Sequence, residues 1–206
     1  RSIEQLEGTY LKYFLLEEGS LKPISNPVTI YPYSNYAIES VVKMYPGFTL
    51  KAATFSYDDG VSEDINTIAS LDKYGAKATF NLVAKWRDGT SNRLLQYYND
   101  KGSTDEERFA YIKELYSGHE IASHSYSHPP VQLEEGQTSS DSYGNVLEGV
   151  SGDTIIEEFA KNHQYIKDNL DTEMTGIAWP YSGPYNRSDY TTIRNAILDS
   201  GYLYAR

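Results

Sequence analysis

Short apolar runs and amphipathic stretches alternate along the chain from Lys51 to its last residue. The apolar runs have the length of β-strands and lie at residues 52–57, 76–83, 119–123, 175–181 and 202–205. The segments between successive runs carry apolar positions at helical spacing, with one polar interruption after the third run. Strands that alternate with helices indicate right-handed βαβ units and a single parallel sheet.

The predicted helices begin at polar residues that can cap a helix. Thr104 and Glu107 have the spacing of a capping box. Ser62, Asp153 and Ser188 are the candidate N-caps of the other three helices. The apolar stripe expected on the helix after Asp153 consists of Ile156, Phe159, His163, Ile166 and Leu170.

Two regions do not follow this alternation. Residues 1–50 are predicted to form a strand-rich and turn-rich extension, with two short strands around a turn in "TYLKYFLLEEGSLKPI". The main domain is then expected at residues 51–206. Within it, residues 129–152 are polar and rich in Gly and Ser without periodicity, which predicts a long loop.

Composition narrows the class of protein. The chain has 206 residues, enough for one sizeable domain, and its net charge of −11 comes without any Lys/Arg-rich run. We therefore expect no nucleic-acid partner. No apolar stretch approaches the roughly 20 residues of a membrane-spanning helix. Cysteine is absent, which excludes disulfides, thiolate metal sites and cysteine nucleophiles. The 20 tyrosines are compatible with stacking on sugars and equally with a hydrated surface.

Candidate catalytic side chains follow two of the predicted strands. Asp58, Asp59 and Gly60 lie where the first strand ends, and His124 and His128 lie where the third ends. The carboxyl ends of parallel strands share one edge of a sheet, so we expect these residues to meet. Residues four apart lie roughly 13 Å apart on a straight strand but about 5–6 Å apart on a helical turn. We therefore predict a single helical turn that directs both imidazoles at one point.

Two imidazoles and one carboxylate make a three-ligand site with an open position, the arrangement of a hydrolytic zinc centre. One aspartate would then bind the cation, and the other would stay free to take a proton from bound water. Each motif alone has a simpler explanation, because Asp-Asp-Gly is most often a solvated turn and His-x-x-x-His is common. The other two histidines, His119 and His163, are interpreted as structural.

A third group of residues, "AWPYSG" from Ala178 to Gly183, lies where the fourth apolar run ends. Its proline and glycine fix a loop whose backbone N–H could bind an oxyanion. Trp179 and Tyr181 offer flat faces for a sugar ring. The alternative is a buried aromatic strand end, which the segment by itself favours.

These motifs together resemble those of the polysaccharide deacetylase family, carbohydrate esterase family 4. "TFSYDDG" is similar to the first family motif, "HSYSH" to the second and "AWPYSG" to the third. The resemblance covers residues 51–206 and also includes "YGAKATFNL" and "GHEIASHSYSH". It implies a distorted (β/α) barrel and metal-dependent removal of acetyl groups from sugar polymers, usually at N-acetylglucosamine units.

The resemblance also implies a role for each matching position. Asp58 would be the catalytic base, and the Tyr181 backbone N–H would share the oxyanion with the metal. Zinc is the expected cofactor, with cobalt or nickel as alternatives. The residues expected to hold the metal are Asp59, His124 and His128, and those expected to contact the carbohydrate are Trp179, Pro180 and Tyr181.

Two departures from the family pattern limit what the resemblance implies. The third motif usually opens with an arginine that orients the base, and Ala178 stands there. A general-acid histidine in a late Leu-x-His motif is also missing, and five strands are too few to close the barrel. We therefore expect an incomplete barrel, with C-terminal truncation favoured over an N-terminal patch or a different acid.

Three functional hypotheses follow. The first is an active carbohydrate deacetylase at the cell envelope or in the extracellular space of a bacterium. The second is a catalytically impaired relative that binds glycans without turning them over, suggested by the two departures. The third is a doubly wound α/β protein in which the motifs occur by chance; Asp59, His124 and His128 would then lie far apart.

Overall fold

The computed structural model describes residues 14–17, 20–23 and 53–206, and the chain divides into two compact units, Arg1–Ala52 and Ala53–Arg206. The first unit contains β1 (Phe14–Glu17) and β2 (Ser20–Pro23), which pair antiparallel. This pair confirms the two short strands predicted there. The rest of the predicted N-terminal extension lies outside the described residues.

The second unit is built on a five-stranded parallel sheet in the order β3-β4-β5-β8-β9. Its strands are β3 (Ser56–Asp59), β4 (Thr79–Leu82), β5 (Glu120–Ser123), β8 (Gly176–Ile177) and β9 (Tyr204–Ala205). Each strand joins the same side of the one before it, as in a (β/α) barrel. A doubly wound sheet would reverse direction at a switch point, so that hypothesis is wrong. The predicted α/β class with parallel strands is confirmed, and β3 and β9 form the two edges.

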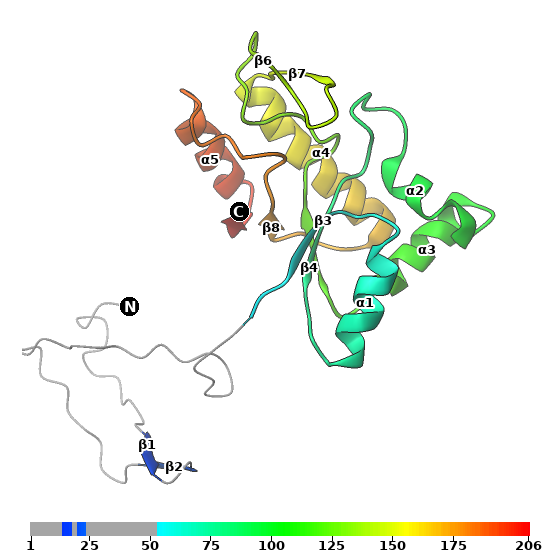
Figure 1. Ribbon diagram of the computed structural model, residues 1–206, viewed down its shortest axis with the longest axis vertical. Coiled ribbons are helices and arrows are strands. Elements are labelled where there is room, and N and C mark those ends of the chain that lie inside the picture. Colours follow the sequence, from blue (N-terminus) through cyan, green and yellow to red (C-terminus); the bar gives the residue numbers. More distant parts are fainter. Residues whose placement is uncertain (1–13, 18–19, 24–52) are drawn as a thin grey trace, which may run out of the picture. The chain divides into compact units, whose positions relative to one another are not determined.

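Helices flank this sheet in chain order (Figure 1), with α3 packed on α4 and α4 packed on α5. They are α1 (Asp64–Lys73), α2 (Arg93–Tyr97), the 3₁₀ turn η3 (Asn99–Lys101), α3 (Asp105–Leu115), α4 (Gly152–Leu170) and α5 (Tyr190–Asp199). In the part of the chain that the structure describes, no helix combines the length and apolarity needed to cross a bilayer.

The helix boundaries test the capping predictions. The capping box of α3 is confirmed, because the Glu107 backbone N–H donates to Thr104 Oγ1 and the Glu107 carboxylate accepts from the Thr104 N–H. The observed N-caps of α1, α4 and α5 are Glu63, Ser151 and Asp189, in place of the predicted Ser62, Asp153 and Ser188. Ser151 is in the extended conformation that an N-cap requires, and its Oγ accepts from the Thr154 N–H at 3.1 Å.

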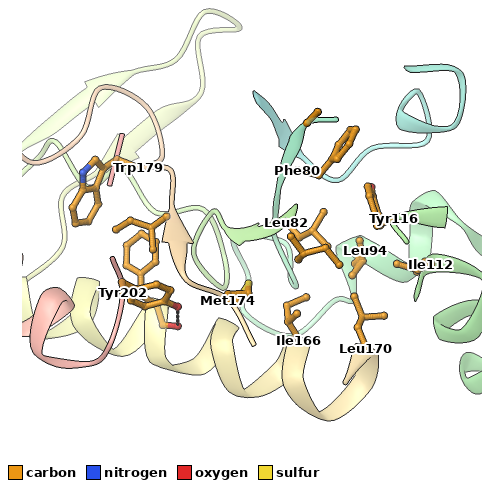
Figure 2. Packing of buried hydrophobic residues seen from close by; sticks show 14 of the residues in the cluster. Phe80, Leu82, Leu94, Ile112, Tyr116, Ile166, Leu170, Met174, Trp179 and Tyr202 are labelled. Atoms are coloured by element: carbon orange, nitrogen blue, oxygen red, sulfur yellow. Dashed lines mark hydrogen bonds between the residues drawn. The ribbon is translucent and has the colours of Figure 1, made fainter. Parts of the chain in front are cut away.

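The hydrophobic core lies between the sheet and the helices. Figure 2 shows Leu82 of β4, Ile112 of α3 and Ile166 of α4 gathered in this layer, and all three are fully buried. The buried stripe of α4 consists of Ile155, Phe159, Asn162, Ile166 and Leu170. The predicted positions Ile156 and His163 were therefore each wrong by one residue, and the polar residue that enters the core is Asn162.

Asn162 ties α4 to the sheet through hydrogen bonds. Its Nδ2 donates to the Leu82 carbonyl oxygen at 2.8 Å and to Ser123 Oγ at 2.9 Å. These partners are the last residues of β4 and β5. Buried polar groups are costly unless they are paired, so Asn162 favours one placement of α4 beneath the carboxyl ends of these strands.

A β-hairpin interrupts the segment that we predicted to be a long loop. β6 (Thr138–Ser140) and β7 (Val146–Glu148) pair antiparallel, which corrects that prediction. The turn is held by Asp141, whose carboxylate accepts from the backbone N–H groups of Tyr143 and Asn145, each at 2.9 Å. Polar hairpins of this kind lack the apolar alternation that marks strands in a sequence.

A buried carboxyl group at the start of α1 makes stability depend on pH. Asp64 accepts a hydrogen bond from Tyr116 Oη at 2.7 Å, and that hydroxyl lies 2.9 Å from Tyr98 Oη. Burial raises the pKa of Asp64 to about 6, against the opposing effect of the Tyr116 hydrogen bond. A carboxyl whose pKa is higher in the folded than in the unfolded state costs stability as it ionises.

We expect Asp64→Asn to remove this cost. Between about pH 4 and pH 6 the wild type should lose stability relative to the variant, and the gap should then stay constant. A shift of about two pKa units corresponds to a gap of up to about 3 kcal/mol. Urea unfolding of both proteins across this pH range measures it. A gap that does not change with pH would contradict the prediction.

Candidate metal and catalytic site

The two neighbouring aspartates end β3, and their side chains have different hydrogen-bond partners. Asp58 lies on the same face as Ser56, and a single amide nitrogen, Asn81 Nδ2, contacts both side chains at 2.9 Å. Asp59 has a φ of 82° and Gly60 a φ of 67°, so the chain leaves the strand through two left-handed residues. The backbone therefore assigns the two carboxylates to different surroundings.

Asp59 lies against both histidines of the second motif. Its Oδ1 is 3.8 Å from His124 Nε2 and 3.6 Å from His128 Nε2. The three ligand atoms all lie within 4.8 Å of one another. Tetrahedral zinc bound to nitrogen and oxygen places its ligand atoms about 3.3 Å apart. The donor set and its spacing therefore fit a divalent cation such as zinc.

Hydrogen bonding and burial prepare the imidazoles as ligands. His124 Nδ1 lies 2.8 Å from the Ala178 carbonyl oxygen. A carbonyl can only accept, so Nδ1 carries the hydrogen, and Nε2 is the ring nitrogen that faces the site. Burial, followed by the neighbouring His124, lowers the pKa of His128 well below its usual value, so that this ring is neutral at neutral pH.

The histidines converge, but not through a helical turn. Ser125 and His128 both have positive φ, 67° and 57°, so residues 124–128 form a bend with two left-handed residues. The His128 N–H donates to Ser125 Oγ at 3.0 Å, and the two imidazole centroids lie 4.8 Å apart. The predicted helical turn is therefore wrong, because a side-chain hydrogen bond replaces the helical one.

The bend is held from below by α4. The Glu158 carboxylate accepts from the Ser127 backbone N–H at 2.7 Å and from Ser127 Oγ at 2.9 Å. Burial raises the pKa of Glu158, against the opposing effect of these two hydrogen bonds. Left-handed non-glycine residues are strained, and such anchoring keeps His128 in place.

A buried arginine stands on the other side of Asp59. Arg93, at the start of α2, donates from Nη1 to Asp59 Oδ1 at 3.1 Å. Its guanidinium lies 5.0 Å from the ring centroid of Trp86 and 5.7 Å from that of Tyr97. Burial raises the pKa of Asp59, but Arg93 together with the nearby His128 and His124 outweighs this effect and holds the pKa below its usual value. Asp59 is therefore available as an anionic ligand.

The third motif contributes Tyr181 to the site. Its ring centroid lies 4.9 Å from that of His128, and its hydroxyl accepts a hydrogen bond from Arg87. Tyr181 has a φ of 57°, and within residues 53–206 no acceptor is paired with its backbone N–H. This N–H is thus available to a ligand, as the predicted oxyanion role requires.

The other two ring-bearing residues of this motif, Trp179 and Pro180, are buried. Trp179 is 6% exposed and packs edge-to-face on Phe159, with centroids 5.2 Å apart. Pro180 is also buried. Their burial agrees with the alternative of a buried aromatic strand end, and the contact of Trp179 and Pro180 with carbohydrate stays a prediction. Tyr181, at 36% exposure, keeps a face toward solvent.

The remaining histidines lie apart from this site. The side chain of His119 is buried, with Nε2 3.3 Å from Asp72 Oδ1 and with Nδ1 accepting from the Ala78 N–H. His163 Nε2 lies 2.7 Å from Glu173 Oε2 on the outer side of α4. Both pairings agree with the structural roles predicted for them.

The family of this chain is shown by its match to a known family pattern. The sequence pattern of the family described as polysaccharide deacetylase matches residues 48–204, which is most of the chain. The chain belongs to the polysaccharide deacetylase family. No curated protein matches the sequence significantly.

Solved structures resemble part of this chain. The deacetylase domain of BpsB from Bordetella bronchiseptica is 14% identical to this chain, with a TM-score of 0.50. The match covers 74% of this chain and 62% of the BpsB domain. The deacetylase PplD of Streptococcus pyogenes is 21% identical with a TM-score of 0.46, over 71% and 51%. A family 4 pseudoenzyme of Bacillus anthracis is 17% identical with a TM-score of 0.47, over 78% and 44%. This chain thus spans about half the length of these proteins, and identities this low bear on the fold alone.

Several residues that contact the site were not predicted from the sequence, and four of them show why. Two of them could have been found from their places in the predicted sheet. Asn81 lies in β4 opposite Asp58, and Arg206 directly follows the last strand. The other two, Arg93 and Glu158, lie on helices and reach the site only through tertiary packing. No local pattern distinguishes them from other charged helix residues.

Proposed function

We propose that this protein is a metal-dependent hydrolase that removes acetyl groups from a carbohydrate polymer, with an N-acetylglucosamine-type glycan as the expected substrate. One observation carries the proposal: the donor atoms of Asp59, His124 and His128 converge within 4.8 Å of one another. The neighbouring residue Asp58 has a separate hydrogen-bond partner, Asn81. The expected place of action is the envelope or extracellular space of a bacterium, where such polymers lie.

The cation would be held by Asp59, His124 and His128, with zinc expected and cobalt or nickel as alternatives. When bound, a divalent cation at such a site supplies Lewis acidity toward an acyl oxygen and toward water. Arg93 keeps Asp59 ionised and in place, and the Ala178 carbonyl fixes the ring orientation of His124.

The reaction is the hydrolysis of an amide. Water adds to the acetyl carbonyl, the carbon–nitrogen bond breaks, acetate leaves, and the sugar amine takes up a proton. Asp58 accepts the proton that the attacking water loses. The Tyr181 backbone N–H donates a hydrogen bond to the oxygen on which negative charge develops.

Release of acetate tests this proposal. We expect the zinc-loaded protein to release acetate from acetylated chitooligosaccharides or peptidoglycan fragments, and a chelator to abolish the release because Asp59, His124 and His128 lose their cation. Readdition of zinc or cobalt should restore it. The control is Tyr143→Ala, which alters an exposed aromatic residue in the hairpin turn. Equal release before and after complete removal of metal would contradict metal dependence.

A glycan-binding protein without turnover is the second candidate. It is favoured by Ala178, which stands where the third family motif usually carries an arginine. The two candidates differ in a direct way: binding of zinc and of the chitooligosaccharide, with no acetate produced over long incubation, would favour the second. Both measurements need the same zinc-loaded protein.

A further inference from the structure

The two outermost strands of the sheet, β3 and β9, come together at Asp58. β3 and β9 are separated by three strands, so their backbones would lie about 19 Å apart in a flat sheet. An arginine and an aspartate side chain together do not span that distance. Arg206, directly after β9, nevertheless forms a hydrogen-bonded ion pair with Asp58 Oδ1. The sheet therefore curls until the inner face of its first strand meets the end of its last.

The backbone of Arg206 is fixed from both sides. Its N–H donates to the Ile177 carbonyl oxygen at 3.1 Å, and its carbonyl accepts from the Trp179 N–H at 2.9 Å. These bonds continue the pairing of β9 with β8. The guanidinium therefore approaches Asp58 from an anchor within the sheet.

Both partners of Asp58 bind the same oxygen. Asn81 Nδ2 donates to Oδ1 at 2.9 Å, and Arg206 Nη2 donates to that same atom. Among residues 53–206, nothing donates to Oδ2. An ionised carboxylate accepts on both oxygens, so this arrangement leaves Oδ2 as the atom that can take a proton.

We infer that Arg206 is the positioning residue of Asp58, which holds Oδ1 together with Asn81 and turns Oδ2 toward the reacting water. This inference rests on the proposed function of Asp58 as a base. It also accounts for Ala178, because the cation that the third motif lacks is supplied by the following strand. In this chain Ala178 serves the site through its carbonyl, which orients His124.

Because the Arg206–Asp58 ion pair is exposed, its effect on the reaction rate can be measured apart from its effect on protein stability. The side chains of Arg206 and Asp58 are 45% and 40% exposed, and exposed ion pairs contribute little to folding. Loss of Arg206 should therefore leave the melting temperature and the zinc affinity nearly unchanged. Misplacement of a reacting group, in contrast, lowers the rate by up to about a hundredfold.

The first test compares Arg206→Gln with Arg206→Lys in the full chain loaded with zinc. We expect Arg206→Gln to lower kcat for acetate release about tenfold to a hundredfold with little change in KM, and Arg206→Lys to recover part of the loss. The matched control, Arg194→Gln, removes the same charge from an exposed position on α5 and should behave as the wild type.

A second test uses the absence of cysteine from the chain. Arg206→Cys introduces a unique thiol, which an aminoethyl methanethiosulfonate converts to a cationic side chain and a sulfonatoethyl reagent to an anionic one. We expect the cationic adduct to regain activity and the anionic adduct to fall below the unmodified variant. A mere structural role for Arg206 would not distinguish the two adducts.

Three outcomes overturn the inference: Arg206→Gln with the kcat of the wild type, equal activity of the two adducts, or a crystal structure of the zinc-loaded protein with the guanidinium beyond hydrogen-bond distance of Asp58. The crystal structure gives this answer without a measurement of enzyme activity. If instead the zinc-loaded wild type releases no acetate, the proposed function fails, and that result is distinct from all three.

Discussion

Asp58→Asn is expected to lower kcat for acetate release by about 10²–10⁴-fold, the contribution of a positioned general base. Asparagine has the shape of aspartate, and its Oδ1 can still accept from Asn81 and Arg206 as the carboxylate does. Its other terminal atom is an amide nitrogen, which cannot take a proton from water. The variant should therefore bind zinc with unchanged affinity and fold normally while losing turnover.

The matched control is the same substitution one residue later. Asp59→Asn replaces a predicted metal ligand, so it should lower zinc affinity sharply and leave Arg93 without its carboxylate partner. Calorimetric titration with zinc and measurement of acetate release on both variants give two separate readouts. Equal zinc affinities in the two variants, or full activity of Asp58→Asn, would refute the division of roles between the neighbouring aspartates.

Phe159→Ala is expected to destabilise the protein by about 3–5 kcal/mol, as is usual for a large ring removed from a core. Phe159 is fully buried on α4 and contacts two other aromatic rings, Trp179 at 5.2 Å and Tyr202 at 6.3 Å between centroids. The cavity would lie directly behind the third motif. At this chain length the loss corresponds to a melting temperature lower by roughly 6–20 °C.

Thermal unfolding in the presence of excess zinc measures this effect. Phe159→Leu keeps most of the apolar volume and should lose much less stability. Tyr143→Ala, which removes an aromatic ring that is 90% exposed, should change stability by no more than about 0.5 kcal/mol. A loss in Phe159→Ala as small as that in Tyr143→Ala would show that α4 does not pack on the third motif as described.

The second motif illustrates how far spacing alone can be taken. Two histidines four residues apart, after a strand, predicted convergent imidazoles, and their side chains do converge on Asp59. The conformation that brings them together was predicted wrongly, since Ser125 and His128 are left-handed. The spacing restricts the distance between the rings but not the path of the backbone, which depends on hydrogen bonds to Ser125 Oγ and to the distant Glu158.

The stripe of α4 shows a similar limit. Apolar periodicity located the helix and three of its five buried positions, Phe159, Ile166 and Leu170. The predicted stripe contained Ile156 in place of Ile155 and His163 in place of Asn162. Hydrophobicity alone cannot decide which of two neighbouring isoleucines is buried. The choice depends on partners elsewhere in the chain, such as the Leu82 carbonyl that accepts from Asn162.

Local periodicity is enough to predict the alternation of strands and helices and the parallel sheet, and the rule that parallel strands end at the same side of a sheet brings the three motifs together. The groups that surround Asp58 depend instead on the three-dimensional fold. The curl of the sheet brings Arg206 to Asp58 from 148 positions away in the chain. Such a contact depends on the accumulated twist and bend of five strands, and no segment of the sequence encodes it alone.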